Sequence, residues 1–241
     1  MKEIILPMLV GGQKASWLGL IEVSEIIPDE WSLIGGQLVQ LHCWERGMSP
    51  VRVTNDVDAV LDVKADPKIL SNFTSALQGI GFRPDLPTSQ NHQHRWRREE
   101  AIIDVLIARG VGERASRKTG ISGSTTLEAI GGQGALNSAE KVQISLEGKI
   151  AIINRPHLTG ALVIKSAAFS NTLDNFKDRH LQDLATLASM YSSGDAEIKI
   201  TKKERARVIT ALAQLQKRED ILSVVEGSRE GIERVLMSVE G

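Results

Sequence analysis

The chain has 241 residues, 41% of them hydrophobic and 24% charged, so it can bury a core without disulfides or a structural metal. Its 29 lysines and arginines nearly balance 30 aspartates and glutamates, and a net charge of -1 excludes bulk positive charge as a basis for nucleic-acid binding. Cys43 is the only cysteine, which rules out an internal disulfide and fits a reducing cytoplasm. No run of about 18 apolar residues occurs, so we expect a cytoplasmic protein with no membrane partner.

The first part of the chain predicts two helices around one short strand. Apolar periodicity predicts a helix over residues 15–27, a buried strand over residues 31–34 and a second helix over residues 37–46. Gly35 and Gly36 join this strand to the second helix. A strand, two glycines and a helix form a phosphate-binding arrangement, because glycine lets the backbone approach a ligand and the first N–H groups of the helix face the anion.

An acidic strand is predicted over residues 55–63, and it carries Asp56 and Asp58. Side chains alternate along a strand, so these two carboxylates emerge on the same face, close to each other. Two carboxylates held close together repel each other unless a positive charge lies between them. Mg²⁺ suits oxygen ligands and the phosphates of a nucleotide. The pair therefore predicts a divalent-cation site.

A third acid stands in a later strand. After a predicted helix over residues 66–81, strands are predicted over residues 92–98 and 100–108. The second of these is apolar apart from Asp104, and an ionised carboxylate among apolar neighbours is costly unless it is paired or bound to metal. Asp104 is therefore a candidate site residue.

Two basic segments leave alternatives open. Three arginines flank Trp96 in the predicted strand 92–98, and they either track nucleic acid, with Trp96 stacking on a base, or are exposed around a buried tryptophan. The segment 110–123 is rich in Gly, Ser, Arg and Lys, is expected to be mobile, and has the same ambiguity.

The second part of the chain predicts a change from mixed structure to helices alone. A hairpin is predicted from strands over residues 141–145 and 149–154. Helices are predicted after it over residues 157–170, 176–191, 202–216 and 221–239. We place a domain boundary near residues 154–156, with an α/β domain at 1–154 and a helical domain at 155–241.

The order of these motifs resembles the nucleotidyltransferase superfamily of DNA polymerase beta type. Its pattern is a hydrophobic residue, Gly-Gly or Gly-Ser, then Asp-x-Asp, then a third Asp. The stretch 52–58, Arg-Val-Thr-Asn-Asp-Val-Asp, looks most like the AbiEii-type toxin nucleotidyltransferases of bacterial toxin–antitoxin systems. Lys165 and the stretch 179–184, Arg-His-Leu-Gln-Asp-Leu, are similar to later motifs of that family. The resemblance implies an α+β fold with a small mixed β-sheet nucleotidyltransferase core, flanking helices and a C-terminal helical domain.

The resemblance also implies an activity, which is Mg²⁺- or Mn²⁺-dependent transfer of a nucleoside monophosphate from an NTP to an RNA, such as tRNA, or to a protein. The implied catalytic residues are Asp56, Asp58, Asp104 and Lys165, and the three aspartates are also the implied metal ligands, Asp104 orienting or deprotonating the acceptor hydroxyl. The implied nucleotide-binding residues are Gly35, Gly36, Gln37, Thr54, Lys165 and Asp183. A toxin of this kind would have a cognate antitoxin protein as a partner.

Several alternatives stay open. Gln37 stands where Ser or Thr is common, and His180 where an acid is expected, so a catalytically degenerate binding or antitoxin-like protein is a second hypothesis. A glycosyltransferase that uses Asp-x-Asp is a third. Lys165 could extend its amine to water instead of binding phosphate, and Asp183 could be a structural partner of a nearby Arg or Lys.

Overall fold

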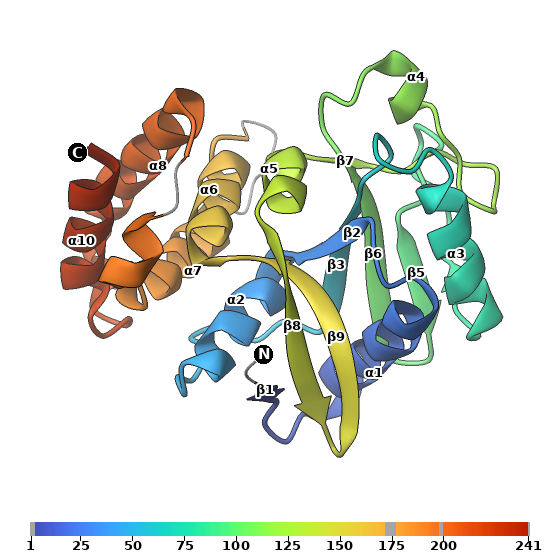
Figure 1. Ribbon diagram of the computed structural model, residues 1–241, viewed down its shortest axis with the longest axis horizontal. Coiled ribbons are helices and arrows are strands. Elements are labelled where there is room, and N and C mark those ends of the chain that lie inside the picture. The colour runs from blue at the N-terminus through green and yellow to red at the C-terminus, as the bar shows by residue number, and fades with distance from the viewer. Residues whose placement is uncertain (1–2, 172–176, 198–199, 241) are drawn as a thin grey trace.

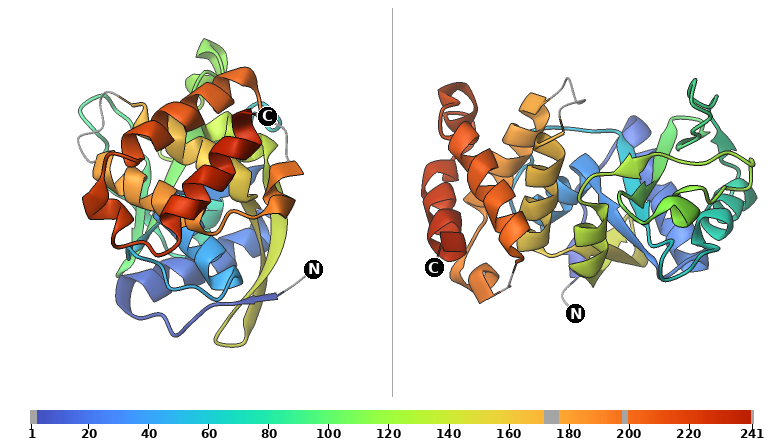
Figure 2. Two further views of the ribbon diagram at one scale, coloured as in Figure 1. Left: turned by 90° about the vertical axis from the view of Figure 1, so that its left-hand side faces the viewer. Right: turned by 90° about the horizontal axis from the view of Figure 1, so that it is seen from above.

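The computed structural model describes residues 3–171, 177–197 and 200–240. Two β-sheets and the helices around them occupy one part of the molecule, and the C-terminal helices pack at one end of it (Figures 1 and 2). The predicted α+β class, with mixed β-structure, flanking helices and helices alone at the C-terminal end, is confirmed.

The larger sheet has the strand order β2-β3-β6-β5-β4, with β7 paired to β6. Its strands are β2 (Trp31–Ile34), β3 (Asp56–Leu61), β4 (Arg83–Pro84), β5 (Arg95–Arg98), β6 (Ala101–Ala108) and β7 (Glu128–Ala129). β3 and β6 run parallel, and their register sets Asp58 opposite Asp104. Both strands are rich in Val, Ile and Leu, which bury against the helices, so the acids are polar exceptions on otherwise apolar strands.

The second sheet has the order β1-β8-β9 and contains the predicted hairpin. Its strands are β1 (Glu3–Ile5), β8 (Ala139–Leu146) and β9 (Lys149–Pro156). The turn residues Glu147 and Gly148 have φ angles of 50° and 83°, and positive φ at both positions is what a two-residue hairpin turn requires. The hairpin prediction is confirmed, although both strands are longer than expected.

The helices of the first part begin at other residues than predicted. They are α1 (Gly11–Ile26), α2 (Gly35–Glu45), α3 (Ile69–Gly79), α4 (Glu113–Ser116) and α5 (Gly132–Asn137). α1 begins at Gly11 and not at residue 15, since its glycines allow close packing: a Cβ on Gly12 would lie 3.0 Å from the carbonyl oxygen of Glu100. α2 begins at Gly35 directly, so the two glycines form its first turn and not a separate loop.

The helices of the second part are α6 (Leu158–Phe169), α7 (Lys177–Ser189), α8 (Lys202–Leu215), α9 (Glu219–Leu222) and α10 (Ser228–Glu240), with a 3-10 helix η1 (Ser193–Glu197) before α8. The single helix predicted over residues 221–239 is wrong, because the chain breaks between α9 and α10. Gly227 has a φ of 73°, a left-handed conformation that ends helical geometry, and the Ser228 hydroxyl bonds to the Leu222 carbonyl across the break.

Buried side chains from both parts of the chain belong to one hydrophobic cluster. Trp17, Phe73 and Ile103 contribute from the first part, and Leu184 and Leu212 from the second. The division at residue 154 stays a prediction. None of the helices formed by residues 3–171, 177–197 and 200–240 has the length and apolar character that a bilayer crossing requires.

Candidate active site

A cavity of about 410 Å³ lies where the larger sheet meets α6 and α7. It is lined by the start of α2, the segment before β3, the aspartates of β3 and β6, and the facing side chains of both helices. Among the predicted site residues it includes Gly35, Gly36, Thr54, Asp56, Asp58, Asp104, Lys165 and Asp183. Segments far apart in the sequence therefore meet in one cavity, as the motif order predicted. Gln37 is the one predicted site residue that is not among the residues lining it.

The carboxylate of Asp58 is the least compensated charge in this cavity. Burial, and then the nearby Asp56 and Asp104, raise its pKa to about 7, although Lys165 and Arg179 oppose the shift. Within the described part of the chain, no hydrogen bond or ion pair to the Asp58 side chain is formed. A half-buried carboxylate next to two others, with no hydrogen-bond partner among the described residues, either holds a proton near neutral pH or accepts a cation.

Gly35 and Gly36 are required by how closely the backbone approaches the site. Gly35 has a φ of 73°, and a Cβ there would lie only 1.8 Å from Oδ2 of Asp58. A Cβ on Gly36 would lie 2.7 Å from Nη2 of Arg52 and 2.7 Å from Cγ2 of Thr54. The first turn of α2 therefore lies directly against the acidic pair, as a phosphate cradle beside a metal site would require.

The other two acids already have partners. The Thr54 hydroxyl donates a short hydrogen bond to Asp56, which fixes the orientation of that carboxylate. Arg95 on β5 donates to both oxygens of Asp104, from Nε at 2.8 Å and from Nη2 at 2.6 Å, and its Nη2 lies 3.5 Å from Asp56. These bonds to Asp104 raise the pKa of Arg95. A carboxylate has about four lone-pair sites, so Asp104 can still accept further bonds.

Gln37 does not line the cavity. It is fully buried, its Oε1 accepts a hydrogen bond from Nε1 of Trp17 at 2.7 Å, and its Nε2 donates to the carbonyl of Thr54 at 2.7 Å. The prediction that this side chain contacts a nucleotide is wrong, because both ends of its amide are engaged. Gln37 instead joins α1, α2 and the segment before β3, and so holds Thr54 in place.

Asp183 lies at the opposite wall, between two cations. Lys165 Nζ donates to its Oδ2 at 2.6 Å, and Arg52 Nη2 approaches the same oxygen at 3.2 Å. The side chains of Asp183 and Lys165 are each 4% exposed. Lys165 does not extend to water, and Asp183 pairs with both Lys165 and Arg52. The nucleotide-binding role of Asp183, which also lines the cavity, stays a prediction.

Two of the three predicted metal ligands, Asp56 and Asp58, present carboxylate oxygens that suit a divalent cation. Asp56 and Asp58 lie on one face of β3, and Asp58 has no other partner that offsets its charge. Across residues 3–171, 177–197 and 200–240, no group of three or more His, Cys, Asp or Glu side chains is placed to hold a metal ion. Both oxygens of Asp104 accept hydrogen bonds from the Arg95 guanidinium.

Some residues of the cavity were not predicted as site residues. Arg52, Arg95 and Arg179 line it and supply positive charge, and His94 and His180 also border it. The position of Arg52 at the head of the acidic stretch could have indicated a role, since it lies two residues before Thr54. Trp96 is fully buried, so it cannot stack on a base, and the arginines beside it form ion pairs with Asp104, Asp85 and Glu22.

Comparison with known proteins agrees with this architecture at the level of fold. No protein-family model and no curated protein matches the chain. An antigenic nucleotidyltransferase-like protein from Paracoccidioides brasiliensis matches with a TM-score of 0.54 and 18% identity, over 89% of this chain and 93% of that one. The antibiotic-resistance factor ANT(2'')-Ia matches at a TM-score of 0.45 and 10% identity, over 88% and 95%. The fold is thus similar to a nucleotidyltransferase-like fold, and the AbiEii-type assignment stays a prediction.

Proposed function

We propose that the protein is a metal-dependent nucleotidyltransferase that transfers a nucleoside monophosphate from an NTP to a hydroxyl of an RNA acceptor. The observation that carries this proposal is the contact between the first turn of α2 and the half-buried carboxylate of Asp58, which forms no hydrogen bond or ion pair with any described residue. A phosphate cradle and a cation-seeking carboxylate in one cavity fit the binding of a nucleotide with its metal. The nucleotidyltransferase-like fold supports the same class of reaction.

The chain's own residues would divide the work as follows. The backbone N–H groups of Gly35 and Gly36 hold terminal phosphates, and Arg52 beside Gly36 adds positive charge. Thr54 orients Asp56, and Asp56 with Asp58 holds the cation. A bound Mg²⁺ or Mn²⁺ would neutralise charge that develops on the transferred phosphoryl group.

The acceptor end of the site would lie at Asp104. The carboxylate of Asp104 can accept the proton of the acceptor hydroxyl as the hydroxyl oxygen bonds to the α-phosphorus of the NTP. The bond between the α-phosphorus and the oxygen that bridges to the β-phosphorus breaks, and pyrophosphate leaves. Arg95 holds Asp104 in place for this step. Lys165 is directed to Asp183, so its charge acts on phosphate only as part of that pair.

We also propose the finer assignment, a toxin of a bacterial toxin–antitoxin pair that acts in the cytoplasm and is silenced by a cognate antitoxin. The stretch 52–58 supports it. One observation favours a second candidate, a degenerate protein that binds nucleotide without transfer: Arg95 already pairs with the predicted third acid. No observation favours the glycosyltransferase.

The test is transfer of label from NTPs labelled at the α-phosphate to a tRNA pool in the presence of Mg²⁺. Asp56→Asn should abolish labelling of RNA. Asp62→Asn is the matched control, because Asp62 is an acid just after the same strand whose side chain accepts bonds from the backbone of residues 64 and 65, outside the cavity. Labelling that survives Asp56→Asn would refute the site, and nucleotide binding with no transfer to any acceptor would favour the second candidate.

A further inference from the structure

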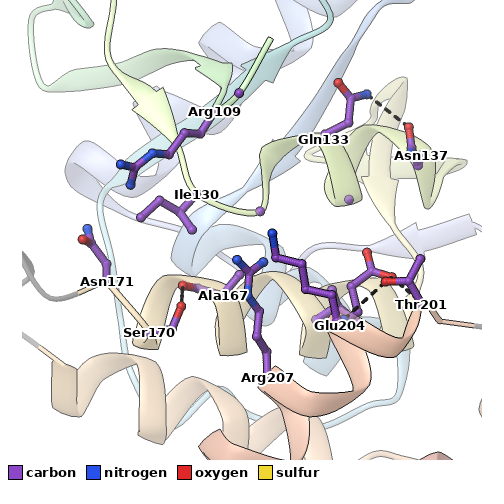
Figure 3. Close-up of a pocket in the computed structure, with 15 residues that line it drawn as sticks. Arg109, Ile130, Gln133, Asn137, Ala167, Ser170, Asn171, Thr201, Glu204 and Arg207 are labelled. Atoms are coloured by element: carbon purple, nitrogen blue, oxygen red, sulfur yellow. Dashed lines mark hydrogen bonds between the residues drawn. The ribbon is translucent and has the colours of Figure 1, made fainter. Parts of the chain in front are cut away.

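A second cavity, of about 580 Å³, lies beside the candidate active site (Figure 3). Its walls are the residues after β6, the segment 130–131 with α5, the α6 side chains that face it and the first turns of α8. Ile130 and Asn171 line both cavities, so the two spaces are neighbours. Nothing in the proposed chemistry uses this second cavity.

Three cations line the second cavity without compensation. They are Arg109 after β6, and Lys203 and Arg207 on α8. Among residues 3–171, 177–197 and 200–240, no acidic side chain forms an ion pair with any of the three. Arg109 and Arg207 enter from opposite walls, as Figure 3 shows. This contrasts with the arginines of β5, which all have acidic partners.

Glu204, the acidic residue among the described lining residues, is engaged in hydrogen bonds within α8 and its N-cap. Glu204 accepts hydrogen bonds from the backbone N–H of Thr201 at 2.8 Å and from its hydroxyl at 2.7 Å, and so closes the capping box that starts α8. The floor is closely packed: Gly131 has a φ of 81°, and a Cβ there would lie 3.0 Å from Cβ of Ala167. The cavity is therefore a preformed, positively charged groove on a protein whose net charge is -1.

We propose that this cavity binds the phosphate backbone of the RNA acceptor and leads its reacting end into the candidate active site. The inference rests on the proposed function and names where its acceptor lies. Phosphates are the ligands that uncompensated Arg and Lys side chains on facing walls would take. None of the described residues that line the cavity is aromatic, so these residues would contact the backbone and not stack on bases, and binding should depend little on sequence.

The test measures binding of a labelled single-stranded RNA by fluorescence anisotropy, without NTP, over a range of salt concentrations. The variant is Lys203→Glu with Arg207→Glu, and the control is Lys68→Glu with Lys217→Glu, which makes the same change in net charge at exposed lysines outside the cavity. We expect the first variant to lose affinity by about tenfold or more, and its salt dependence to become shallower by about one unit for each cation removed. The control should change little.

Binding of fluorescent ATP and GTP is measured on the same variants, and thermal unfolding confirms that both are folded. Equal RNA affinity in the two variants would overturn the inference. A loss of ATP or GTP affinity without a loss of RNA affinity would also overturn it, because the cavity would then hold nucleotide phosphates. The proposed function fails separately, by absent NMP transfer in a protein that still binds RNA through this cavity.

Discussion

The candidate active site joins two groups of charges that are organised in opposite ways. On the α6–α7 wall, Asp183 lies between Lys165 and Arg52, so its negative charge is matched within the protein. On the sheet wall, three carboxylates share Arg95 and the more distant Lys165 and Arg179, and Asp58 has no direct partner in the part of the chain that the structure describes. The charges of the first group are matched within the protein, and the second group has an excess of negative charge.

This difference separates structural from functional use of the same residue types. A buried ion pair with matched charge fixes how two helices pack, and it gains little from a ligand. Adjacent carboxylates on parallel strands cost free energy in the free protein and recover it when a cation binds. Substitutions in the two groups should therefore affect stability in opposite directions.

The largest effect is expected at the matched group. Asp183→Ala leaves Lys165 buried without its partner, and breaking a buried pair in this way costs about 3–5 kcal/mol of unfolding free energy. Asp178→Ala is the control on the same helix, because Asp178 forms an exposed ion pair with Arg218, and solvent-screened pairs of this kind contribute little to stability. Urea unfolding measures both. An equal, small loss in the two variants would show that the Asp183 group is not structural.

A smaller effect is expected where the backbone meets the acids. Gly35→Ala adds a Cβ at a φ of 73° and against Asp58, so it should lose more than the strain of about 1–2 kcal/mol that the left-handed conformation alone imposes. Gly47→Ala provides that reference, since Gly47 follows the same helix at a φ of 67° with open space around it. If thermal unfolding shows equal losses, α2 does not press on the acidic pair.

The smallest effect is expected to be a gain. The pKa of Asp58 is raised to about 7 from 3.8. The folded protein therefore loses stability as pH rises from near 4 to 7, and above pH 7 the full cost of ionising Asp58 is present. Asp58→Asn removes that cost and should raise Tm in the metal-free protein by about 2–4 °C per kcal/mol recovered. The gain should be larger at about pH 8 than at about pH 5. A loss of Tm at both pH values would contradict the account.

The local sequence pattern predicted the strands that carry the site better than it predicted which site residues form ion pairs. β3, β6 and the hairpin follow from apolar runs and turn residues, and parity along β3 was enough to bring Asp56 and Asp58 to one face. The pairing of Arg95 with Asp104 depends on the register of β5 against β6, which no local pattern reports. It changes a three-acid site into a pair of acids beside a neutralised one.

Burial was also set by distant contacts. Gln37 is a polar residue in the first turn of α2, a position from which a side chain can reach a ligand. Only the position of Trp17 on α1 shows that its amide instead joins α1 to the segment before β3. The start of α1 at Gly11 likewise depends on the close approach of Glu100. In each case tertiary packing decided a position that helix and turn patterns had assigned differently.

The most direct test of the central claim is titration of Mn²⁺ into the metal-free protein by calorimetry, with wild type beside Asp56→Asn/Asp58→Asn. Wild type is expected to bind Mn²⁺, more tightly above pH 7 than below it because the proton on Asp58 competes with the metal, and the double variant is expected not to bind it. Absence of binding by wild type, or equal binding by the double variant, would contradict that claim.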